Sequence, residues 1–275
     1  MKYFDAVVQT LLNCRGRVLE CMKCSSYKQP IRRNVFGDEM KLIDLVAEKS
    51  IVESLGRYFS NATIISEESG EITIGCGGPP YVVVDPIDGS VNAVRGYPCF
   101  STSIAIADGV MLSSVVAGGV VNIVSGDIYY AEKGCGAYLN GGAVRVSGIE
   151  SIGEALISAD LNVKGRIPGY IAGISSILEK AAHVRFLGTD ALEVCLVASG
   201  AADAFIDLRG FLRSTDLSAS VFIVREAGGV VADADGNDLE ISIYPPSTAQ
   251  FIASSTRGLL KEIIRELKTY EDCRY

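Results

Sequence analysis

An apolar run at residues 81–84 leads directly into two aspartates, Asp85 and Asp88, and into a turn whose sequence is Asp-Pro-Ile-Asp-Gly-Ser. A valine-rich run of this length predicts a buried strand, so both carboxylates should stand where a central strand ends. Clustered carboxylates together with a backbone carbonyl, such as that of Ile87, are the ligands that hard divalent cations prefer. The turn therefore predicts a metal site, although aspartates in turns also often only cap and solvate the backbone.

Two further acidic segments lie at the ends of predicted elements. Glu67 and Glu68 follow a short strand predicted at 62–66, and Asp216 opens an apolar-periodic helix predicted at 216–227. Each segment also has a structural explanation, because paired glutamates can simply be solvated and an aspartate at a helix start commonly serves as an N-cap. Together with the two aspartates of the first turn, however, they form a set of carboxylates at strand and helix ends, where α/β proteins place their sites. Two cations held by such a set clamp a phosphoryl group in many enzymes.

Length, charge and cysteine content limit the class of protein. The 275 residues can bury a sizeable core, and the net charge of −8 argues against nucleic acid or an anionic membrane as a main partner. The charge is compatible with a phosphate substrate, because bound cations invert the local field. With no apolar stretch long enough to span a bilayer and no signal-peptide core, we expect a cytoplasmic protein whose eight cysteines are mostly free thiols. Cys21 and Cys24 have zinc-like spacing, but no second pair completes a site.

The elements that must position these carboxylates differ between the two parts of the chain. Helical periodicity at 4–12 and 42–55 flanks a polar loop predicted at 28–40. A Gly- and Pro-rich loop is predicted at 70–80, ahead of the central strand. Regular turn signals at 101–146 then predict an antiparallel meander.

A composition shift at 147–153 predicts a boundary between a half at 1–150 and a half at 151–275. The second half alternates strand and helix, as an α/β layer does. Its predicted strands are at 155–158, 184–187, 204–206, 230–233 and 251–254, and its predicted helices are at 168–181, 189–200, 216–227 and 257–270.

The order and spacing of these motifs resemble the inositol monophosphatase and fructose-1,6-bisphosphatase superfamily of Mg²⁺-dependent phosphatases. The resemblance covers about Asp38 to Val231, and segments 37–48 and 207–213 look especially like archaeal members that hydrolyse both inositol phosphates and fructose 1,6-bisphosphate. It implies an α+β half followed by an α/β half in a layered αβαβα sandwich, and it implies a homodimer. The motifs that carry it are Glu67-Glu68, the 85–90 turn, Asn92, the segments 96–98 and 134–141, and Asp216 ahead of the 226–229 segment.

The resemblance also implies roles for individual residues. The ligands of two or three Mg²⁺ ions, or of Mn²⁺ in their place, are Glu67, Glu68, Asp85, the Ile87 carbonyl, Asp88 and Asp216. The catalytic residues are Glu67, Ser90, Asp44 and Asp38. Of these, Glu67 and Ser90 orient and deprotonate the attacking water, with Asp44 hydrogen-bonded to Ser90. The phosphate binders are Asp88, Gly89 and Ser90. Structural roles stay open for some of these residues, since Asp44 could be a polar helix position, Glu68 a solvated neighbour and Ser90 an N-cap.

The substrate-binding residues implied by the same resemblance are Arg185, Gly188, Thr189, Asp190, Asp207, Arg209 and Arg213, with Lys164, Arg166 and Tyr170 as further candidates for a second phosphate. Arginine pairs bidentately with phosphate, but each of these cations could also be an ordinary surface charge. A second phosphate would favour fructose 1,6-bisphosphate, and a single ring with hydroxyl contacts would favour myo-inositol 1-phosphate. The alternatives are a phosphatase of 3′-phosphoadenosine 5′-phosphate and a non-catalytic metal-binding protein of the same fold.

Overall fold

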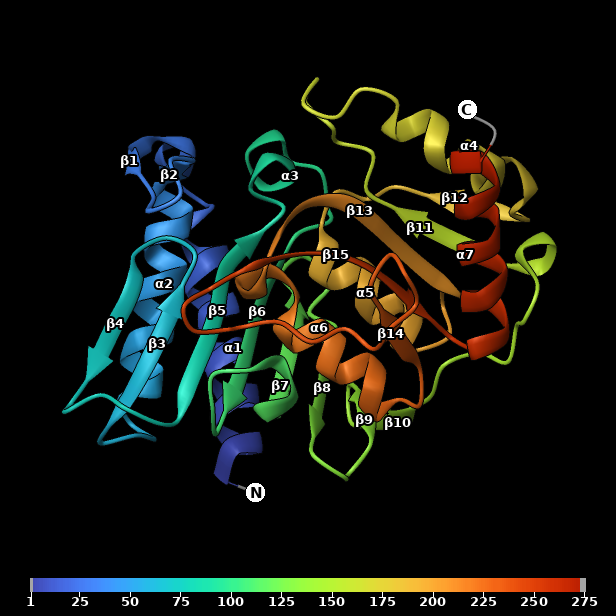
Figure 1. Ribbon diagram of the computed structural model, residues 1–275. Helices are drawn as coiled ribbons and strands as arrows, with labels where there is room; N and C mark the ends of the chain where they lie inside the picture. The colour runs from blue at the N-terminus through green and yellow to red at the C-terminus, as the bar shows by residue number, and fades with distance from the viewer. Residues whose placement is uncertain (1, 273–275) are drawn as a thin grey trace.

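The structure, a computed structural model that describes residues 2–272, consists of two β-sheets, a small hairpin and the helices that cover the sheets (Figure 1). The α-helices within these residues are α1 (Lys2–Cys21), α2 (Leu42–Leu55), α3 (Ser90–Arg95), α4 (Tyr170–Lys180), α5 (Asp190–Ala198), α6 (Ser214–Glu226) and α7 (Arg257–Asp272). The 3-10 turns are η1 (Ser25–Lys28), η2 (Leu112–Ser114) and η3 (Ile152–Glu154).

The larger sheet has eight strands in the order β10-β9-β8-β7-β6-β5-β3-β4, and the smaller has five in the order β12-β11-β13-β15-β14. The larger sheet contains β3 (Ala62–Ser66), β4 (Gly70–Ile74), β5 (Tyr81–Asp88), β6 (Ser101–Ala107), β7 (Val115–Asn122), β8 (Ile128–Glu132), β9 (Ala137–Leu139) and β10 (Gly142–Val144). The smaller contains β11 (Leu156–Ala159), β12 (His183–Arg185), β13 (Ala204–Arg213), β14 (Val230–Ala232) and β15 (Thr248–Ser254). The hairpin pairs β1 (Pro30–Arg33) with β2 (Glu39–Lys41).

The helices and sheets alternate in five layers, which confirms the predicted αβαβα sandwich (Figure 1). Helices α1 and α2 share an apolar core with one face of the larger sheet, and α5 and α6 fill the space between the two sheets. Helices α4 and α7 share a third core with the outer face of the smaller sheet. Each sheet is therefore covered by helices on both faces, as the predicted combination of α+β and α/β halves requires.

The central strand β5 shows why its sequence is apolar without alternation. Val82 and Val84 are buried in the core that contains α1 and α2, whereas Val83 is buried in the core that contains α5 and α6. Successive side chains of a strand point to opposite faces, so a strand between two helical layers needs apolar residues at consecutive positions. Burying each valine contributes about 1.5–3 kcal/mol. The predicted buried strand is confirmed and continues through Asp88.

The antiparallel meander at 101–146 and the alternation of strand and helix in the second half are confirmed. Two predicted loops were wrong. The segment 28–40 contains most of the β1–β2 hairpin, and the segment 70–80 begins with β4, which pairs antiparallel with β3. The strands of the hairpin are too short to give a pattern. Strand β4 does alternate polar and β-branched residues, which favours a strand, but it begins at Gly70 and is followed by Gly75, and these turn signals led to a loop prediction for the whole segment.

No helix in the described part of the chain combines the length and the hydrophobicity needed to cross a bilayer. The seven cysteines within residues 2–272 all carry free thiols, including Cys21 and Cys24. The eighth, Cys273, lies outside the described residues.

Candidate active site

The three acidic segments predicted from the sequence meet at one open pocket of about 1010 Å³. Residues of the larger sheet's strand ends line one side of it, among them Glu67, Asp85 and Asp88. The other side is lined by residues of the second half, including Asp190 and Asp216. A concave site built from strand ends of one half and helix starts of the other is a common arrangement for binding a small molecule.

Strand register brings Glu67 and Asp85 together. Strands β3 and β5 are parallel with Ser66 opposite Val84, so the chain leaves the sheet at neighbouring points, and the Glu67 N–H donates to the Val84 carbonyl at 3.1 Å. Helix α6 carries Asp216 in its first turn to the same place. Carboxylate oxygens of Glu67, Asp85 and Asp216 lie within 4.8 Å of one another.

These carboxylates are strained electrostatically without a cation. Burial raises the pKa of Glu67 to about 8, with Asp216 adding to the shift and Arg213 opposing it. Burial also raises the pKa of Asp85, followed by the repulsion of Glu67, and it raises the pKa of Asp216 to about 6. Oδ1 of Asp85 is buried without a hydrogen-bond partner. The group fits a hard divalent cation, which would supply that partner and neutralise the repulsion.

Glu68 lies beside this group, in the turn after β3. Its Oε2 atom is buried and has no hydrogen-bond partner. Burial raises its pKa to about 8, with the charge of Asp44 adding to the shift. Glu48 of α2 fixes this turn, because its carboxylate accepts hydrogen bonds from the Ser69 N–H at 3.1 Å and from the Ser69 hydroxyl at 2.6 Å. Glu68 is therefore a fixed acid facing the pocket and not a solvated neighbour.

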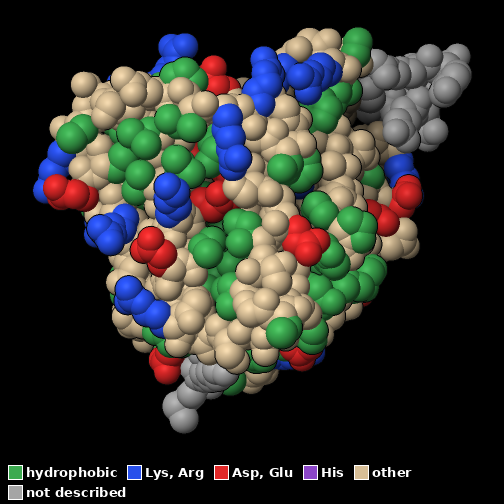
Figure 2. Space-filling view, turned by 90° about the vertical axis from the view of Figure 1, so that its left-hand side faces the viewer, with side chains coloured by type: hydrophobic (Ala, Val, Ile, Leu, Met, Phe, Trp, Pro, Cys, Tyr) green, Lys and Arg blue, Asp and Glu red, His purple; other side chains and the backbone are tan. Residues whose placement is uncertain are grey.

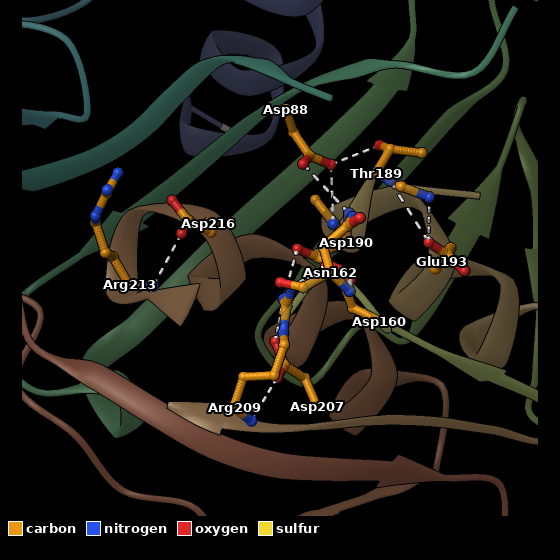
Figure 3. A network of polar contacts seen from close by, with 12 residues as sticks. Asp88, Asp160, Asn162, Thr189, Asp190, Glu193, Asp207, Arg209, Arg213 and Asp216 are labelled. Atoms are coloured by element: carbon orange, nitrogen blue, oxygen red, sulfur yellow. Dashed lines mark hydrogen bonds and ion pairs between the residues drawn. The ribbon is translucent and has the colours of Figure 1, made fainter. Parts of the chain in front are cut away.

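Asp88 is oriented by donors from both halves of the chain (Figure 3). Its Oδ2 atom accepts hydrogen bonds from the Thr189 hydroxyl at 2.5 Å, the Ala191 N–H at 3.0 Å and the Ser101 hydroxyl at 3.1 Å. Its Oδ1 atom accepts from the Asp190 N–H at 3.2 Å. Burial raises the pKa of Asp88, while these hydrogen bonds oppose the shift. Ser101 was not found from the sequence, because a serine inside a buried strand carries no separate signal.

The Ser90 hydroxyl lies between a carbonyl and a carboxylate. Its Oγ atom is 3.0 Å from the Ile87 carbonyl oxygen and 3.4 Å from Oδ1 of Asp44. The other oxygen of Asp44 accepts a 2.6 Å hydrogen bond from the N–H of Lys41, the N-cap residue of α2. Burial raises the pKa of Asp44 to about 6. A hydroxyl linked to a fixed carboxylate can pass a proton, which is the arrangement a general base needs.

Gly89 precedes α3 with φ +86°, a conformation that side-chain-bearing residues rarely adopt. A Cβ atom there would lie 3.1 Å from the Gly188 carbonyl oxygen and 3.3 Å from Phe100. The glycine therefore allows the turn after β5 to approach the 188–189 segment of the other half closely. Gly89 and Ser90 both line the pocket at the start of α3.

Arg213 links the pocket to the β1–β2 hairpin. Its guanidinium donates to Oε1 of Glu67 at 2.7 Å and to Oδ2 of Asp38 at 2.6 Å, and it stacks 4.1 Å from the ring centroid of Phe36. Asp38 thus stands at the pocket on the hairpin turn, with its side chain 59% exposed. The resemblance placed Arg213 on the substrate, whereas the structure pairs it with two acids.

Arg209 is the centre of a second acidic group (Figure 3). Its guanidinium nitrogens lie 2.6 Å from Asp160, 2.6 Å from Asp207 and 3.6 Å from Asp190. Oxygens of these three aspartates lie within 4.8 Å of one another. The single charge of the arginine offsets only part of their repulsion, since burial and then the charge of Asp160 raise the pKa of Asp190 in spite of it. Asp160 was missed from the sequence, although its place directly after β11 is the same strand-end signal that identified Asp85.

The other predicted substrate residues divide into two sets. Gly188 lines the pocket, and Thr189 lies beneath it against Asp88. Lys164 and Arg166 line the pocket as well. Besides Thr189, three candidates are not in its lining. Arg185 donates to the Val184 carbonyl, the Tyr170 hydroxyl is buried against the carbonyl of Asp160, and Asp207 is fully buried against Arg209.

The face on the left of Figure 1 shows acidic, basic and apolar side chains interspersed (Figure 2). On this face, the basic side chains do not form the continuous field that nucleic-acid binding uses.

The chain is similar in sequence and in structure to known phosphatases. The model of the inositol monophosphatase family matches residues 21–272. A fructose-1,6-bisphosphatase/inositol-1-monophosphatase of Thermococcus kodakarensis is 37% identical over 96% of this chain and 96% of its own length. Human inositol monophosphatase 1 is 32% identical over 94% of this chain and 92% of its own. The crystal structure of the extragenic suppressor protein suhB of Bartonella henselae has a TM-score of 0.82 at 28% identity, and the alignment covers 96% of this chain and 97% of that one.

These similarities span nearly the whole chain, and they agree with a pocket whose carboxylates fit divalent cations. The superfamily expected from the motifs is confirmed, and with it an enzyme rather than a non-catalytic binding protein. This chain belongs to the inositol monophosphatase family and is a metal-dependent hydrolase of phosphoric monoesters.

Proposed function

We propose that the chain removes the phosphate of a small sugar or polyol phosphate, with myo-inositol 1-phosphate and fructose 1,6-bisphosphate as the candidate substrates. The observation that carries this proposal is the meeting of Glu67, Asp85 and Asp216 within 4.8 Å at a pocket that also contains Asp88. A relative that matches 96% of this chain is named for both activities, which supports the choice of substrates.

The proposed cation is Mg²⁺, with Mn²⁺ as a substitute, because all available ligands are hard oxygen atoms. Two ions would be held by Glu67, Asp85, Asp88, Asp216 and the Ile87 carbonyl, with Glu68 available for a third. When bound, Mg²⁺ lowers the pKa of a coordinated water and neutralises charge on the phosphoryl group.

The chain's own residues would handle the proton and the phosphate. Ser90 and Glu67 orient the attacking water, and Asp44 receives the proton through the Ser90 hydroxyl, 3.4 Å away. The N–H groups of Gly89 and Ser90, at the start of α3, face phosphate oxygens. Asp38 is brought to the pocket by its ion pair with Arg213, where it assists in holding water.

On the substrate side, we propose that Asp190, which lines the pocket, receives sugar or polyol hydroxyls. Asp207, expected from the resemblance to do the same, is fully buried outside the pocket lining with both carboxylate oxygens bonded to Arg209, so it positions that arginine instead. Arg209 is already paired with three aspartates, so it would hold these acids in place rather than bind a phosphate alone. Lys164 and Arg166 are the pocket cations with no acidic partner in the described structure, and a second phosphate would be bound by them.

The test is phosphate release from myo-inositol 1-phosphate and fructose 1,6-bisphosphate side by side, with Mg²⁺ and with EDTA. We expect turnover of at least one substrate with Mg²⁺ and none after chelation. Asp88→Asn should lower kcat/KM by roughly 10³-fold, because the ligand charge is lost. Asp127→Asn is the matched control, since Asp127 lies directly before β8 and outside the pocket lining. Turnover that survives EDTA would contradict the proposal.

A phosphatase of 3′-phosphoadenosine 5′-phosphate stays the alternative, and adding this nucleotide to the same panel of substrates decides between the two.

We also propose a homodimer, which the family resemblance implies, and a cytoplasmic location, since the seven described cysteines carry the free thiols that reducing compartments maintain. Sedimentation analysis and fractionation of cells test these two points.

A further inference from the structure

Asp88 belongs to the first half of the chain, but three of its four hydrogen-bond donors come from residues 189–191 of the second half. These donors are the Thr189 hydroxyl and the first backbone N–H groups of α5. The position of Asp88 therefore depends on how the turn before α5 is held. The turn closes directly against Gly89, since a Cβ atom on Gly89 would approach both the Gly188 carbonyl oxygen and Thr189.

The turn is held by Glu193, a fully buried side chain one turn into α5 (Figure 3). Oε2 of Glu193 accepts hydrogen bonds from the Gly188 N–H at 2.9 Å and the Thr189 N–H at 3.4 Å. Its Oε1 atom accepts from the Leu187 N–H at 3.1 Å and from the Ser158 hydroxyl. Every backbone N–H of the 187–189 turn is thus directed at one carboxylate.

We propose that Glu193 is a positioning residue for Asp88: it fixes the 187–189 turn, and the turn delivers the Thr189 hydroxyl and the N–H groups of α5 to the Asp88 carboxylate. The inference rests on the proposed function, because it takes Asp88 as a cation ligand. Donors that orient a ligand side chain commonly change metal affinity about 10–100-fold when they are lost, although they never touch the metal. Glu193 contacts neither the cation site nor Asp88; it acts on Asp88 through the 187–189 turn.

Glu193→Gln is the informative substitution, because glutamine keeps the volume of the side chain. Its amide nitrogen donates where a carboxylate oxygen accepted, so at least one backbone N–H of the turn loses its partner. The turn then shifts, and Asp88 loses the fixed Thr189 hydroxyl. Direct binding of Mn²⁺ to the metal-free protein, followed by calorimetry or electron paramagnetic resonance, reports this without any turnover. We expect the dissociation constant of the weaker ion to rise about tenfold.

Asp203→Asn is the matched control. Asp203 is also buried and accepts a backbone hydrogen bond, from the Leu156 N–H at 2.7 Å, and it lies outside the pocket lining. A purely structural role predicts the same result for both variants, which is a lower melting temperature with unchanged Mn²⁺ affinity. A positioning role predicts that only Glu193→Gln weakens Mn²⁺ binding, while KM at saturating metal changes less than about twofold.

Thr189→Val and Ser158→Ala test the same chain of contacts with smaller changes, in case the Glu193 variant does not fold. Removing the Thr189 hydroxyl should weaken Mn²⁺ binding about as much as Glu193→Gln, and the double variant should be no weaker than the worse single variant, because both act on the same group of donors to Asp88. Ser158→Ala should produce a smaller loss in the same direction.

The possible outcomes separate this inference from the proposed function. Wild-type protein that binds no Mn²⁺ would overturn both. Wild-type protein that binds Mn²⁺, with equal affinity in Glu193→Gln, would overturn the positioning role and leave the proposed function standing. Additive losses in the double variant would also overturn it, because they would mean that Glu193 and Thr189 act independently.

Discussion

Nη1 of Arg213 lies 2.7 Å from Oε1 of Glu67, so a cation of the chain itself already contacts the acid at the end of β3. Arg213 lies in the last position of β13, directly before α6, so this pair joins the two halves of the chain across the pocket. The arginine lowers the pKa of Glu67 against the larger effect of burial. It therefore offsets part of the repulsion among the carboxylates before any metal binds.

This pair predicts unequal effects of two substitutions on stability. In EDTA, Arg213→Gln should lower the free energy of unfolding by about 1–3 kcal/mol, because it leaves Glu67 buried among acids without its counter-charge. Asp38→Asn should cost less than about 1 kcal/mol, since the Asp38 side chain is 59% exposed and solvent screens the pair. Urea unfolding measures both. Equal losses would mean that the hairpin contact, and not the Glu67 contact, gives Arg213 its role.

The raised pKa values of the carboxylates predict how pH acts on the metal-free protein. The pKa values of Glu67 and Glu68 are raised to about 8 from an ordinary value of 4.5, chiefly by burial. The folded state therefore binds protons more tightly than the unfolded state between these values, and stability falls as pH rises from about 4.5 to about 8. We expect the melting temperature in EDTA to drop by roughly 5 °C or more across this window.

Added Mg²⁺ should remove most of that drop, because it favours the ionised carboxylates that burial disfavours. The comparison needs only thermal unfolding at pH 5 and pH 8, with EDTA and with Mg²⁺. A melting temperature in EDTA that rises over this range would contradict the assignment of raised pKa values to Glu67 and Glu68.

Ser90 provides a test of the proton path. Ser90→Ala removes the hydroxyl that lies 3.0 Å from the Ile87 carbonyl and 3.4 Å from Asp44. We expect kcat to fall by roughly 10²–10⁴-fold with KM changed little, because general base catalysis acts on the chemical step. Ser90→Thr keeps a hydroxyl and should retain most of the activity. If the two variants are equally impaired, the side chain acts by packing and not by proton transfer.

Gly89 and Gly96 form a matched pair at the two ends of α3. Both have positive φ, +86° and +73°, but a Cβ atom meets the Gly188 carbonyl only at Gly89 and meets nothing within 4 Å at Gly96. Gly96→Ala should therefore cost only the backbone penalty of about 1–2 kcal/mol. Gly89→Ala should cost more and also reduce activity, because it moves the turn away from the 188–189 segment. Chemical unfolding and turnover measure the two effects, and equal losses at both positions would contradict this account of the close approach.

The outcome for individual elements shows where local sequence is sufficient. The strand at 81–84 and the helix at 42–55 were predicted closely because their apolar patterns are long and their burial is extensive. Strand β4 was predicted as a loop because Gly70 and Gly75 at its ends are turn signals. The hairpin that carries Asp38 was missed because its two strands have only four and three residues, too few to give a strand pattern.

The acids of the pocket could be predicted from their places at strand and helix ends. The contacts among them could not be predicted from the sequence. Glu193 was not singled out, since a glutamate within a helix is an ordinary residue in a sequence. Asp160 was missed although it stands at a strand end, because no second acid next to it marks the position. Their roles depend on partners 35 and 49 residues away, Ser158 and Arg209.

The sequence by itself determined the family and the central buried strand, and it identified the acids that meet at the pocket. All of these depend on residue types at short spacing, which a chain carries whether or not it is folded. Only the tertiary structure decided that Arg213 neutralises Glu67, that Arg209 is held by three aspartates and that Asp88 is oriented from the other half of the chain. These contacts join residues far apart in the sequence, and they exist only because five packed layers bring both halves to one pocket.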